Sequence, residues 1–256
     1  MANLEDISPR CVAITSVITS GNVGGIGLKS YSIAIDSTGS AAEGRSFREN
    51  LDAHFGVPVK YFVLTHRHGD HTQGLDSFKD TTIICSNQTV KAMPKSFQKA
   101  GFNTVTFSDK YLLKDDDLSV EIYHTGGHTV GSSYIWFPQE KVLFAGDLIF
   151  AKSFPYFGDP KCNPDQWIEA LKNFLVLNFE KLVPGHGPVV GKEEVQKHLD
   201  FFEEFKTNTL DTINAGKSAN DIIIPDFYKY FSPRAGKDAS VRKSAKRNFY
   251  KFYKKK

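Results

Sequence analysis

Metal-ligand side chains crowd into one short stretch of this chain, which reads THRHGDHTQG from residue 65 to residue 74. Three histidines and an aspartate fall within six positions, directly after the apolar run YFVL. His66 and His68 are two residues apart, so in an extended segment both side chains point to the same side and can reach one cation. Asp70 and His71 lie where the segment should enter a short helix, and they can point toward a second cation.

Three further candidates lie in segments that contain glycine, each interpreted as a turn that follows a strand. They are His128 in TGGHTVGS, Asp147 in FAGDLIF and His186 in PGHGP. Because glycine lets the backbone turn sharply, such a turn can aim a single side chain into a pocket. Imidazole and carboxylate without thiolate form a ligand set that suits Zn²⁺, with iron or manganese as alternatives. The pattern therefore predicts a metal centre.

Each of these residues has an ordinary explanation when it is taken alone. A lone histidine is more often a surface residue or a hydrogen-bonded core residue than a ligand, and we interpret His54, His124 and His198 in that way. Cys162 is interpreted as structural or incidental. The HxHxDH cluster differs because so many polar side chains in one segment have no packing role, and a metal site is the preferred interpretation there.

Apolar patterning predicts strands followed by helices, and this succession occurs twice along the chain. Strands are expected at residues 12–20, 30–36, 60–64, 81–86, 104–107, 118–125, 132–137, 141–147 and, before a tight loop, within 180–188. Helices are expected at residues 45–56, 87–100 with an interruption at Pro94, 163–177, 192–213 and 241–256. Two β-layers, each covered on its outer side by helices, account for this order.

Several residues near the predicted ligands have two interpretations each. GNVGGIG, residues 21–27, is expected to be a turn or loop that acts as a mobile flap over the site. Asp36 is either an acceptor that fixes a metal-binding histidine or a cap for the turn after its strand. Tyr156 and Phe154 either line a substrate pocket, where Tyr156 would donate to an oxyanion, or pack in the loop or the core.

Taken in order, HRHGDH, GGHTVGS, GD and PGHGP resemble the metallo-β-lactamase-fold hydrolase superfamily over roughly residues 12–200. The resemblance implies an α+β fold, a four-layer αββα sandwich with the metals at one edge of the two sheets. It also implies a set of ligands: His66, His68 and His128 for one metal, Asp70, His71 and His186 for the other, and Asp147 as the bridge between them.

Other stretches narrow the resemblance within the superfamily. True β-lactamases of this fold carry Cys or Ser where this chain has Asp147, so the site is more similar to those of glyoxalase II, lactonases and nucleases. The stretch LIFAKSFPYFGD lacks the glyoxalase-like GCGR motif, and no segment matches the long exosite insertion of RNase Z-like enzymes. IAIDSTGSAAEGR and FPYFGDPKCNPDQWIEAL resemble the subgroup found beside sulfur-oxidation and quinoprotein systems.

The predicted activity is hydrolysis with two Zn²⁺ ions per chain, in which a water between the metals attacks the acyl carbonyl of a β-lactam, lactone, ester or thioester. Asp70, His71 and Tyr156 are the predicted catalytic residues, and Asp70 would orient the nucleophile. The alternatives are a phosphodiesterase or nuclease, a mononuclear iron enzyme acting on a persulfide, and a metal-dependent binding module. A small-molecule substrate is expected ahead of a nucleic acid.

The charge of the chain is concentrated at its end. The 256 residues carry a net charge of +3, which is too small by itself to indicate nucleic-acid binding. From residue 237 onward nine Lys and Arg stand against one Asp, in a segment that places Val241, Ala245, Phe249 and Phe252 on one helical face. We expect this helix to dock its apolar face on the body, with an arm that contacts RNA or a membrane as the alternative.

Location and organisation are predicted from what the chain lacks. Three widely spaced cysteines without a CxxC motif suit a reducing compartment, and we find neither a signal-peptide pattern nor a run of ~20 apolar residues. A cytoplasmic protein with no membrane partner is therefore expected. We predict a hydrolase domain at residues 1–215 and a basic helical extension at 216–256 that packs on it. The oligomeric state stays open, with a dimer as one option.

Overall fold

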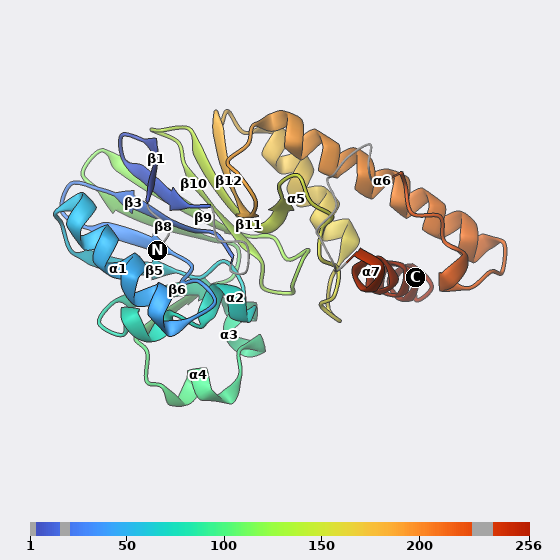
Figure 1. Cartoon of the computed structure of the whole chain (residues 1–256), viewed down its shortest axis with the longest axis horizontal. Coiled ribbons are helices and arrows are strands. Elements are labelled where there is room, and N and C mark those ends of the chain that lie inside the picture. The colour runs from blue at the N-terminus through green and yellow to red at the C-terminus, as the bar shows by residue number, and fades with distance from the viewer. Residues whose placement is uncertain (1–3, 16–20, 227–237) are drawn as a thin grey trace.

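Two mixed β-sheets form the middle of the molecule (Figure 1). The computed structural model describes residues 4–15, 21–226 and 238–256. The first sheet has its strands in chain order: β1 (Glu5–Ser8), β2 (Cys11–Ile14), β3 (Val23–Gly27), β4 (Ser32–Ile35), β5 (Val59–Val63), β6 (Thr82–Ser86) and β7 (Thr104–Phe107). The second sheet has the order β12 (Lys181–His186), β11 (Val142–Phe150), β10 (Ser133–Phe137), β9 (Leu118–His124) and β8 (Lys110–Asp115).

Helical segments connect the parallel strands and follow the second sheet. They are α1 (Ala41–Phe55), α2 (Gly69–Thr72), η1 (Leu75–Phe78), α3 (Asn87–Ala92), α4 (Lys95–Lys99), α5 (Pro164–Val176), α6 (Lys192–Asn214), η2 (Ala219–Asp221) and α7 (Asp238–Tyr253). The predicted interruption at Pro94 is confirmed, because α3 ends before this residue and α4 begins after it. Ser40 caps α1, since its hydroxyl accepts a hydrogen bond from the N–H of Glu43, and Gly56 ends the helix in a left-handed conformation.

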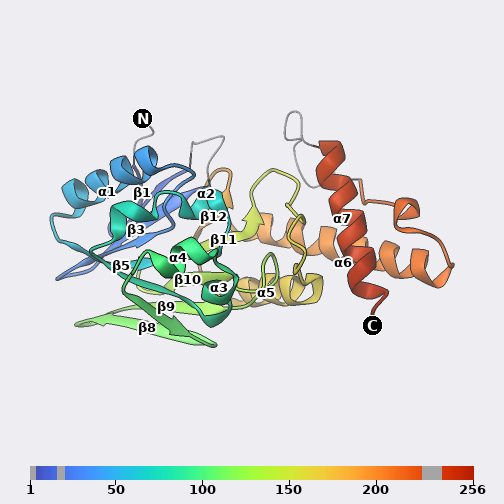
Figure 2. The same ribbon diagram turned by 90° about the horizontal axis from the view of Figure 1, so that it is seen from below.

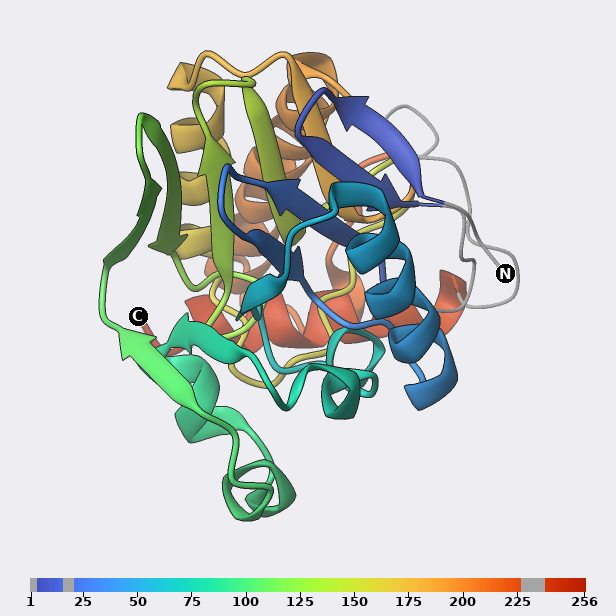
Figure 3. The same ribbon diagram turned by 90° about the vertical axis from the view of Figure 1, so that its left-hand side faces the viewer.

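Three apolar cores separate four layers, which confirms the predicted αββα sandwich. One core lies between the sheets and includes Ile33, Ile84, Ile122 and Phe144. The second fills the space between the first sheet and the helices on its outer side, α1 among them. The third covers the outer side of the second sheet, where α5 and α6 pack. Figure 3 shows α1 in front of the sheets and α5 and α6 behind them.

Parallel pairing brings the ends of two strands to the same edge of the first sheet. β4 pairs with β5 in parallel, and β5 pairs with β6 in the same way. Asp36 directly follows β4, and the HxHxDH segment follows β5. Because neighbouring parallel strands end at the same edge, these two sequence motifs must lie close together. In the second sheet β11 and β12 are also parallel, and they carry Asp147 and His186.

The glycine-rich segment 21–27 is not the loop that the sequence predicts. Residues 23–27 form the buried strand β3, which pairs with both β2 and β4. A Cβ atom at Gly24 would lie 2.3 Å from the ring of Phe144, and one at Gly25 would lie 2.4 Å from the side chain of Leu51. The glycines therefore serve close packing on both faces of the strand, and the predicted flap is wrong for these residues.

Other element boundaries differ from the predicted ones in smaller ways. The predicted strand 12–20 corresponds to β2, which ends at Ile14, and residues 16–20 lie outside the described part of the chain. Strands β1 and β8 were not predicted, because half of the residues of each are charged: Glu5 and Asp6 in β1, and Lys110, Lys114 and Asp115 in β8. Strand β11 runs on to Phe150, so Asp147 lies inside a strand and not in the turn that its flanking glycine suggests.

The C-terminal helix α7 lies across α6 (Figure 2). Its residues Ala245, Phe249 and Tyr253 are buried in the third core, and the Phe249 ring lies 4.2 Å from the ring of Phe205 on α6. These contacts place the apolar face of α7 against α6, and the division into a domain at 1–215 and a packed extension at 216–256 stays a prediction. Within the described residues no helix has both the length and the apolar character needed to cross a membrane.

Candidate metal centre

The predicted metal ligands meet where the two sheets end. They come from the segment after β5, from α2, from the turn after β9, from β11 and from the end of β12, and they are His66, His68, Asp70, His71, His128, Asp147 and His186. Within the described chain their donor atoms form two groups, each within 4.8 Å. Asp36 also lies within this distance of His66 and His71. The structure thus brings together every residue that the sequence predicts as a ligand.

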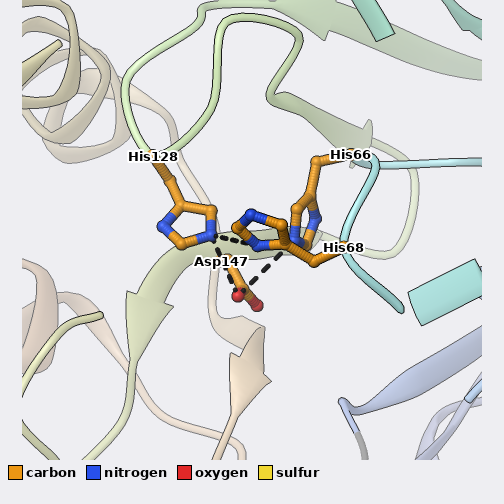
Figure 4. A group of neighbouring side chains, drawn as sticks. All are labelled: His66, His68, His128 and Asp147. Carbon is orange, nitrogen blue, oxygen red and sulfur yellow. Dashed lines mark hydrogen bonds and ion pairs between the residues drawn. The ribbon is translucent and has the colours of Figure 1, made fainter. Parts of the chain in front are cut away.

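One oxygen of Asp147 faces the first group of histidines (Figure 4). Its Oδ2 lies 3.5 Å from Nε2 of His66 and 3.3 Å from Nε2 of His128. Nδ1 of His68 lies 2.9 Å from Nε2 of His128. Four ligands at about 2.1 Å around a tetrahedral zinc ion would lie roughly 3.4 Å from one another, so these separations fit a single cation.

The other oxygen of Asp147 faces the second group. Its Oδ1 lies 3.0 Å from Nε2 of His71 and 3.4 Å from Nε2 of His186. Asp70 completes this group, with its Oδ2 3.2 Å from Nε2 of His186 and 3.7 Å from Nε2 of His71. Because each oxygen of one carboxylate faces a different set of donors, Asp147 stands where a residue shared by two cations would have to stand.

Buried polar atoms without hydrogen bonds show that this cluster fits a metal. Nε2 of His66, Nε2 of His71 and Oδ1 of Asp147 are all buried and make no hydrogen bond of acceptable geometry. Leaving such a group without a partner costs about 1–3 kcal/mol, so native structures seldom tolerate three in one place. All three atoms point into the cluster, where a cation would satisfy them together.

Burial and charge set the protonation of the cluster. Burial lowers the pKa of His66 well below its ordinary value, and it lowers the pKa of His128 to about 3, so both rings keep a free lone pair at neutral pH. Burial opposes the charged forms of His71 and Asp147 too. For this pair the attraction wins: Asp147 and Asp36 raise the pKa of His71, and the surrounding histidines hold the pKa of Asp147 well below its usual range. The carboxylates of Asp36 and Asp147 therefore make the cluster favourable for positive charge.

Asp36 supports the second group from behind. Its Oδ2 accepts a hydrogen bond from Nδ1 of His71 at 2.8 Å, which orients the ring so that Nε2 faces Asp147. The same carboxylate accepts from the N–H and the hydroxyl of Thr65 at 2.9 and 2.7 Å. The interpretation of Asp36 as an acceptor that fixes a histidine of the cluster is confirmed, although its left-handed backbone, with φ 58°, also starts the following turn.

Turns with left-handed glycines aim two of the histidines, as the sequence predicts. Gly127 precedes His128 and has φ 96°, and Gly187 follows His186 and has φ 92°. Residues other than glycine rarely adopt such φ angles. The three histidines interpreted as structural lie outside the cluster; His198, for example, accepts from the N–H of Phe150 and lies against the carbonyl of Glu194.

The segment 151–163, between β11 and α5, supports the first group, a role that its residue types do not predict. Asp159 is buried, and its Oδ2 lies 3.2 Å from Nε2 of His68 and accepts from Arg67 at 2.6 Å. The carbonyl of Tyr156 lies 3.0 Å from Nδ1 of His128. Asp159 is separated from His68 by 91 positions, so no local pattern could have connected them.

A cavity of about 450 Å³ opens over the cluster. Its size is within the roughly 300–1,000 Å³ typical of small-molecule sites. Tyr156, which is 41% exposed, and Phe154 lie in its wall, as predicted. Ser240 and Val241 of α7 were not predicted to line it, but they do. The cavity also contacts the cluster itself, through His68, Asp70, Asp147 and His186.

A four-layer αββα fold with a histidine and aspartate cluster at the end of its sheets defines a class of metallohydrolases. The family model of the Metallo-beta-lactamase superfamily matches residues 21–186. The chain belongs to this superfamily of hydrolases, whose members use metal ions, and the resemblance found in the sequence is confirmed. The further likeness to glyoxalase II and to the sulfur-oxidation subgroup stays a prediction.

Curated relatives match parts of the chain at moderate identity. The "Beta-lactamase-like protein 2 homolog" of Caenorhabditis elegans is 27% identical over 144 residues, which cover 56% of this chain and 48% of that protein. "Metallo-beta-lactamase type 2" of Elizabethkingia meningoseptica is 24% identical over 182 residues, which cover 68% of this chain and 72% of that protein. This chain therefore spans about half the length of the C. elegans relative.

Solved structures share the fold at lower identity. The metallo-beta-lactamase from Pontibacter korlensis has a TM-score of 0.69 and 21% identity, and the match covers 79% of this chain and 99% of that one. The sec-alkylsulfatase Pisa1 from Pseudomonas sp. has a TM-score of 0.80 and 16% identity, with 99% of this chain and 50% of that one covered. The likeness to the alkylsulfatase thus extends over the C-terminal helices.

Proposed function

We propose that this chain is a dinuclear zinc hydrolase that acts on the acyl carbonyl of a small molecule, such as a β-lactam, a lactone, an ester or a thioester. The observation that carries the proposal is the position of Asp147, whose two oxygens face two separate groups of ligand-type side chains. Under this proposal His66, His68 and His128 hold one ion, Asp70, His71 and His186 hold the other, and Asp147 is shared. Imidazole and carboxylate donors favour zinc, with iron and manganese as the alternatives.

Bound zinc would supply a water of near-neutral pKa and would polarise the carbonyl. The chain itself would orient the reactants. Asp70 is half-buried and lines the cavity, so its free lone pairs can accept a hydrogen bond from the attacking water and orient it. His71, fixed by Asp36, keeps the second group in place.

The cavity wall would hold the substrate next to these residues. Phe150 and Phe154 offer apolar surface, which excludes water from the reacting centre. The hydroxyl of Tyr156 is available as a donor to the oxyanion that develops on the carbonyl oxygen. Val241 and Ser240 make α7 part of the lining, so the C-terminal helix would contribute to substrate selection.

Elemental analysis combined with a substrate panel tests the proposal. We expect two zinc ions per chain, and hydrolysis of at least one of nitrocefin, a homoserine lactone, an aryl ester or a thioester. Asp147→Asn should lose most of this activity, whereas His124→Gln, a histidine change outside the cluster, should retain it. Turnover of phosphodiesters alone, or oxygen consumption with a persulfide by an iron-loaded protein, would refute the acyl hydrolase.

A sulfate or phosphate ester is the second candidate substrate class. The likeness to an alkylsulfatase over 99% of the chain and the cationic side chains of α7, a helix that also lines the cavity, favour it. Arg242, Lys243 and Lys246 line a second hollow, between η2 and α7, where they would attract an anion. An alkyl sulfate and bis-p-nitrophenyl phosphate therefore belong in the panel. A rate that falls steeply with ionic strength would support this class.

A further inference from the structure

The segment 151–163 makes hydrogen bonds to the imidazole rings of two histidines of the first group. In the described chain its hydrogen bond to the second group joins backbone atoms only, from the N–H of Ala151 to the carbonyl of His186 at 2.8 Å. Asp159 reaches Nε2 of His68, and the carbonyl of Tyr156 reaches Nδ1 of His128. Each contact involves the ring nitrogen that faces away from the cluster. Such a contact fixes the tautomer and the orientation of a metal-binding imidazole.

Helix α7 in turn holds this segment. Nδ2 of Asn248 donates hydrogen bonds to the carbonyls of Phe157 and Asp159, the second at 3.4 Å. The ring of Phe157 packs edge-on against the ring of Phe249, with 5.0 Å between their centroids. Neighbouring residues of α7 therefore hold the backbone and a side chain of the segment. Figure 1 shows α7 beside the chain that joins β11 to α5.

We propose that α7 is a positioning element for one half of the metal centre, and that Asn248 is its key residue. The inference rests on the proposed binding of two metal ions. Asn248 fixes the carbonyls of Phe157 and Asp159, the segment then fixes Asp159 and the carbonyl of Tyr156, and these orient His68 and His128. Neither Asn248 nor Asp159 is a ligand, so both act through other residues.

The second group has a separate support, which makes the proposal selective. Asp36 holds His71 from the first sheet, and His186 lies at the end of β12, whose backbone pairs with β11. Neither support involves α7. Loss of the Asn248 contact should therefore weaken the site formed by His66, His68 and His128 and leave the other site unchanged. A general loosening of the protein would instead weaken both.

Asn248→Asp is the test variant, because it keeps the shape of the side chain but replaces the donor with an acceptor that faces two carbonyls. Tyr250→Phe is the matched control, because it removes a donor from the same helix. The Tyr250 hydroxyl donates to the carbonyl of Lys217 at 2.8 Å and not to the segment 151–163. If Asn248→Asp does not fold, Asn248→Ala removes the donor without adding charge. Circular dichroism checks the fold of each metal-free variant.

Zinc affinity, measured by competition with a chromophoric chelator, is the readout. In a His186→Ala background, which retains the first group, Asn248→Asp should lower the affinity about 10- to 100-fold, as loss of outer support does in other metal sites. In a His128→Ala background it should leave the affinity unchanged, and Tyr250→Phe should be neutral in both. Equal losses in the two backgrounds, no loss in the first, or the same loss with Tyr250→Phe would overturn the proposal.

Asp159→Asn tests the route. Because Asn248 and Asp159 act through one segment, the double variant should lose less affinity than the product of the two single losses. Fully multiplicative losses would overturn the shared route. The absorption spectrum of the Co²⁺-loaded protein should change with either variant. These readouts need no substrate: zinc binding that depends on Asn248 without any hydrolysis would reject the proposed activity alone, while hydrolysis without this dependence would reject the role of α7 alone.

Discussion

Replacement of Asp36 by asparagine should weaken one of the two proposed metal sites. The carboxylate of Asp36 accepts three buried hydrogen bonds, from the N–H of Thr65, the hydroxyl of Thr65 and Nδ1 of His71. An asparagine side chain has one acceptor oxygen and one NH₂ group, so in either orientation the NH₂ group meets a buried N–H donor. The negative charge that holds Nδ1–H of His71 is lost in both orientations.

The expected magnitude follows from these contacts. A hydrogen bond to a charged group contributes about 1.5–3 kcal/mol, and each ~1.4 kcal/mol changes an equilibrium constant tenfold. Zinc affinity at the site of Asp70, His71 and His186 should therefore fall roughly 10- to 100-fold, the range found for outer supports of metal ligands. The site of His66, His68 and His128 should change little.

Chelator competition on the purified protein near neutral pH measures both affinities. Asp116→Asn is the matched control, because Asp116 has the same left-handed backbone, with φ 58°, but lies in the exposed turn between β8 and β9. It should bind zinc like the unmodified protein. Unchanged affinity of both sites in the Asp36 variant, or an equal loss at both, would refute the assignment of Asp36 as the support of His71.

Three further predictions concern stability. Removal of the metals with EDTA should lower the melting temperature by several degrees, since free zinc at about 100 times Kd contributes ~2.7 kcal/mol per site; calorimetry with zinc added back measures this, and an unchanged melting temperature would argue against a built metal site. Gly24→Ala should lower the free energy of unfolding by about 1–3 kcal/mol, because its Cβ would lie 2.3 Å from the Phe144 ring. Phe144→Leu should then lower the free energy of unfolding, measured in urea titrations, by less in the Gly24→Ala background than in the unmodified protein. Strictly additive losses would contradict the clash. Burial lowers the pKa of His198 to about 4, against about 6.5 in the unfolded chain. As the pH falls, the unfolded chain therefore takes up a proton before the folded one does. The free energy of unfolding should fall by up to roughly 3 kcal/mol between about pH 6.5 and pH 4. His198→Gln should flatten that part of the profile in urea titrations of metal-free protein, and parallel profiles would show that His198 does not contribute.

The sequence by itself determined the ligand types and most of the fold. HxHxDH after an apolar run predicts a metal site because charged side chains in such a cluster have no packing role. Glycines beside His128 and His186 predict sharp turns, and both turns have left-handed glycines. Strands followed by helices, repeated along the chain, predict two sheets with outer helices, and this arrangement is confirmed.

Local patterns failed where long-range packing decides the conformation. Residues 21–27 have the composition of a loop, yet Gly24 and Gly25 lie in a buried strand because Phe144 and Leu51 occupy the space that their side chains would fill. Asp147 has a flanking glycine that suggests a turn, but the pairing of β11 with β12 continues the strand past it. Composition cannot distinguish a flexible glycine from one that makes room for a distant ring.

The supports of the first group, His66, His68 and His128, were decided by the tertiary structure alone. Asp159 meets His68 across 91 positions, and Asn248 meets the carbonyl of Asp159 across 89. Asparagine and aspartate are common in loops and on helix surfaces, so their residue types carry no signal of such a role. A hydrogen bond acts over about 3 Å of space, whatever the separation in sequence, and only folding sets which groups come that close.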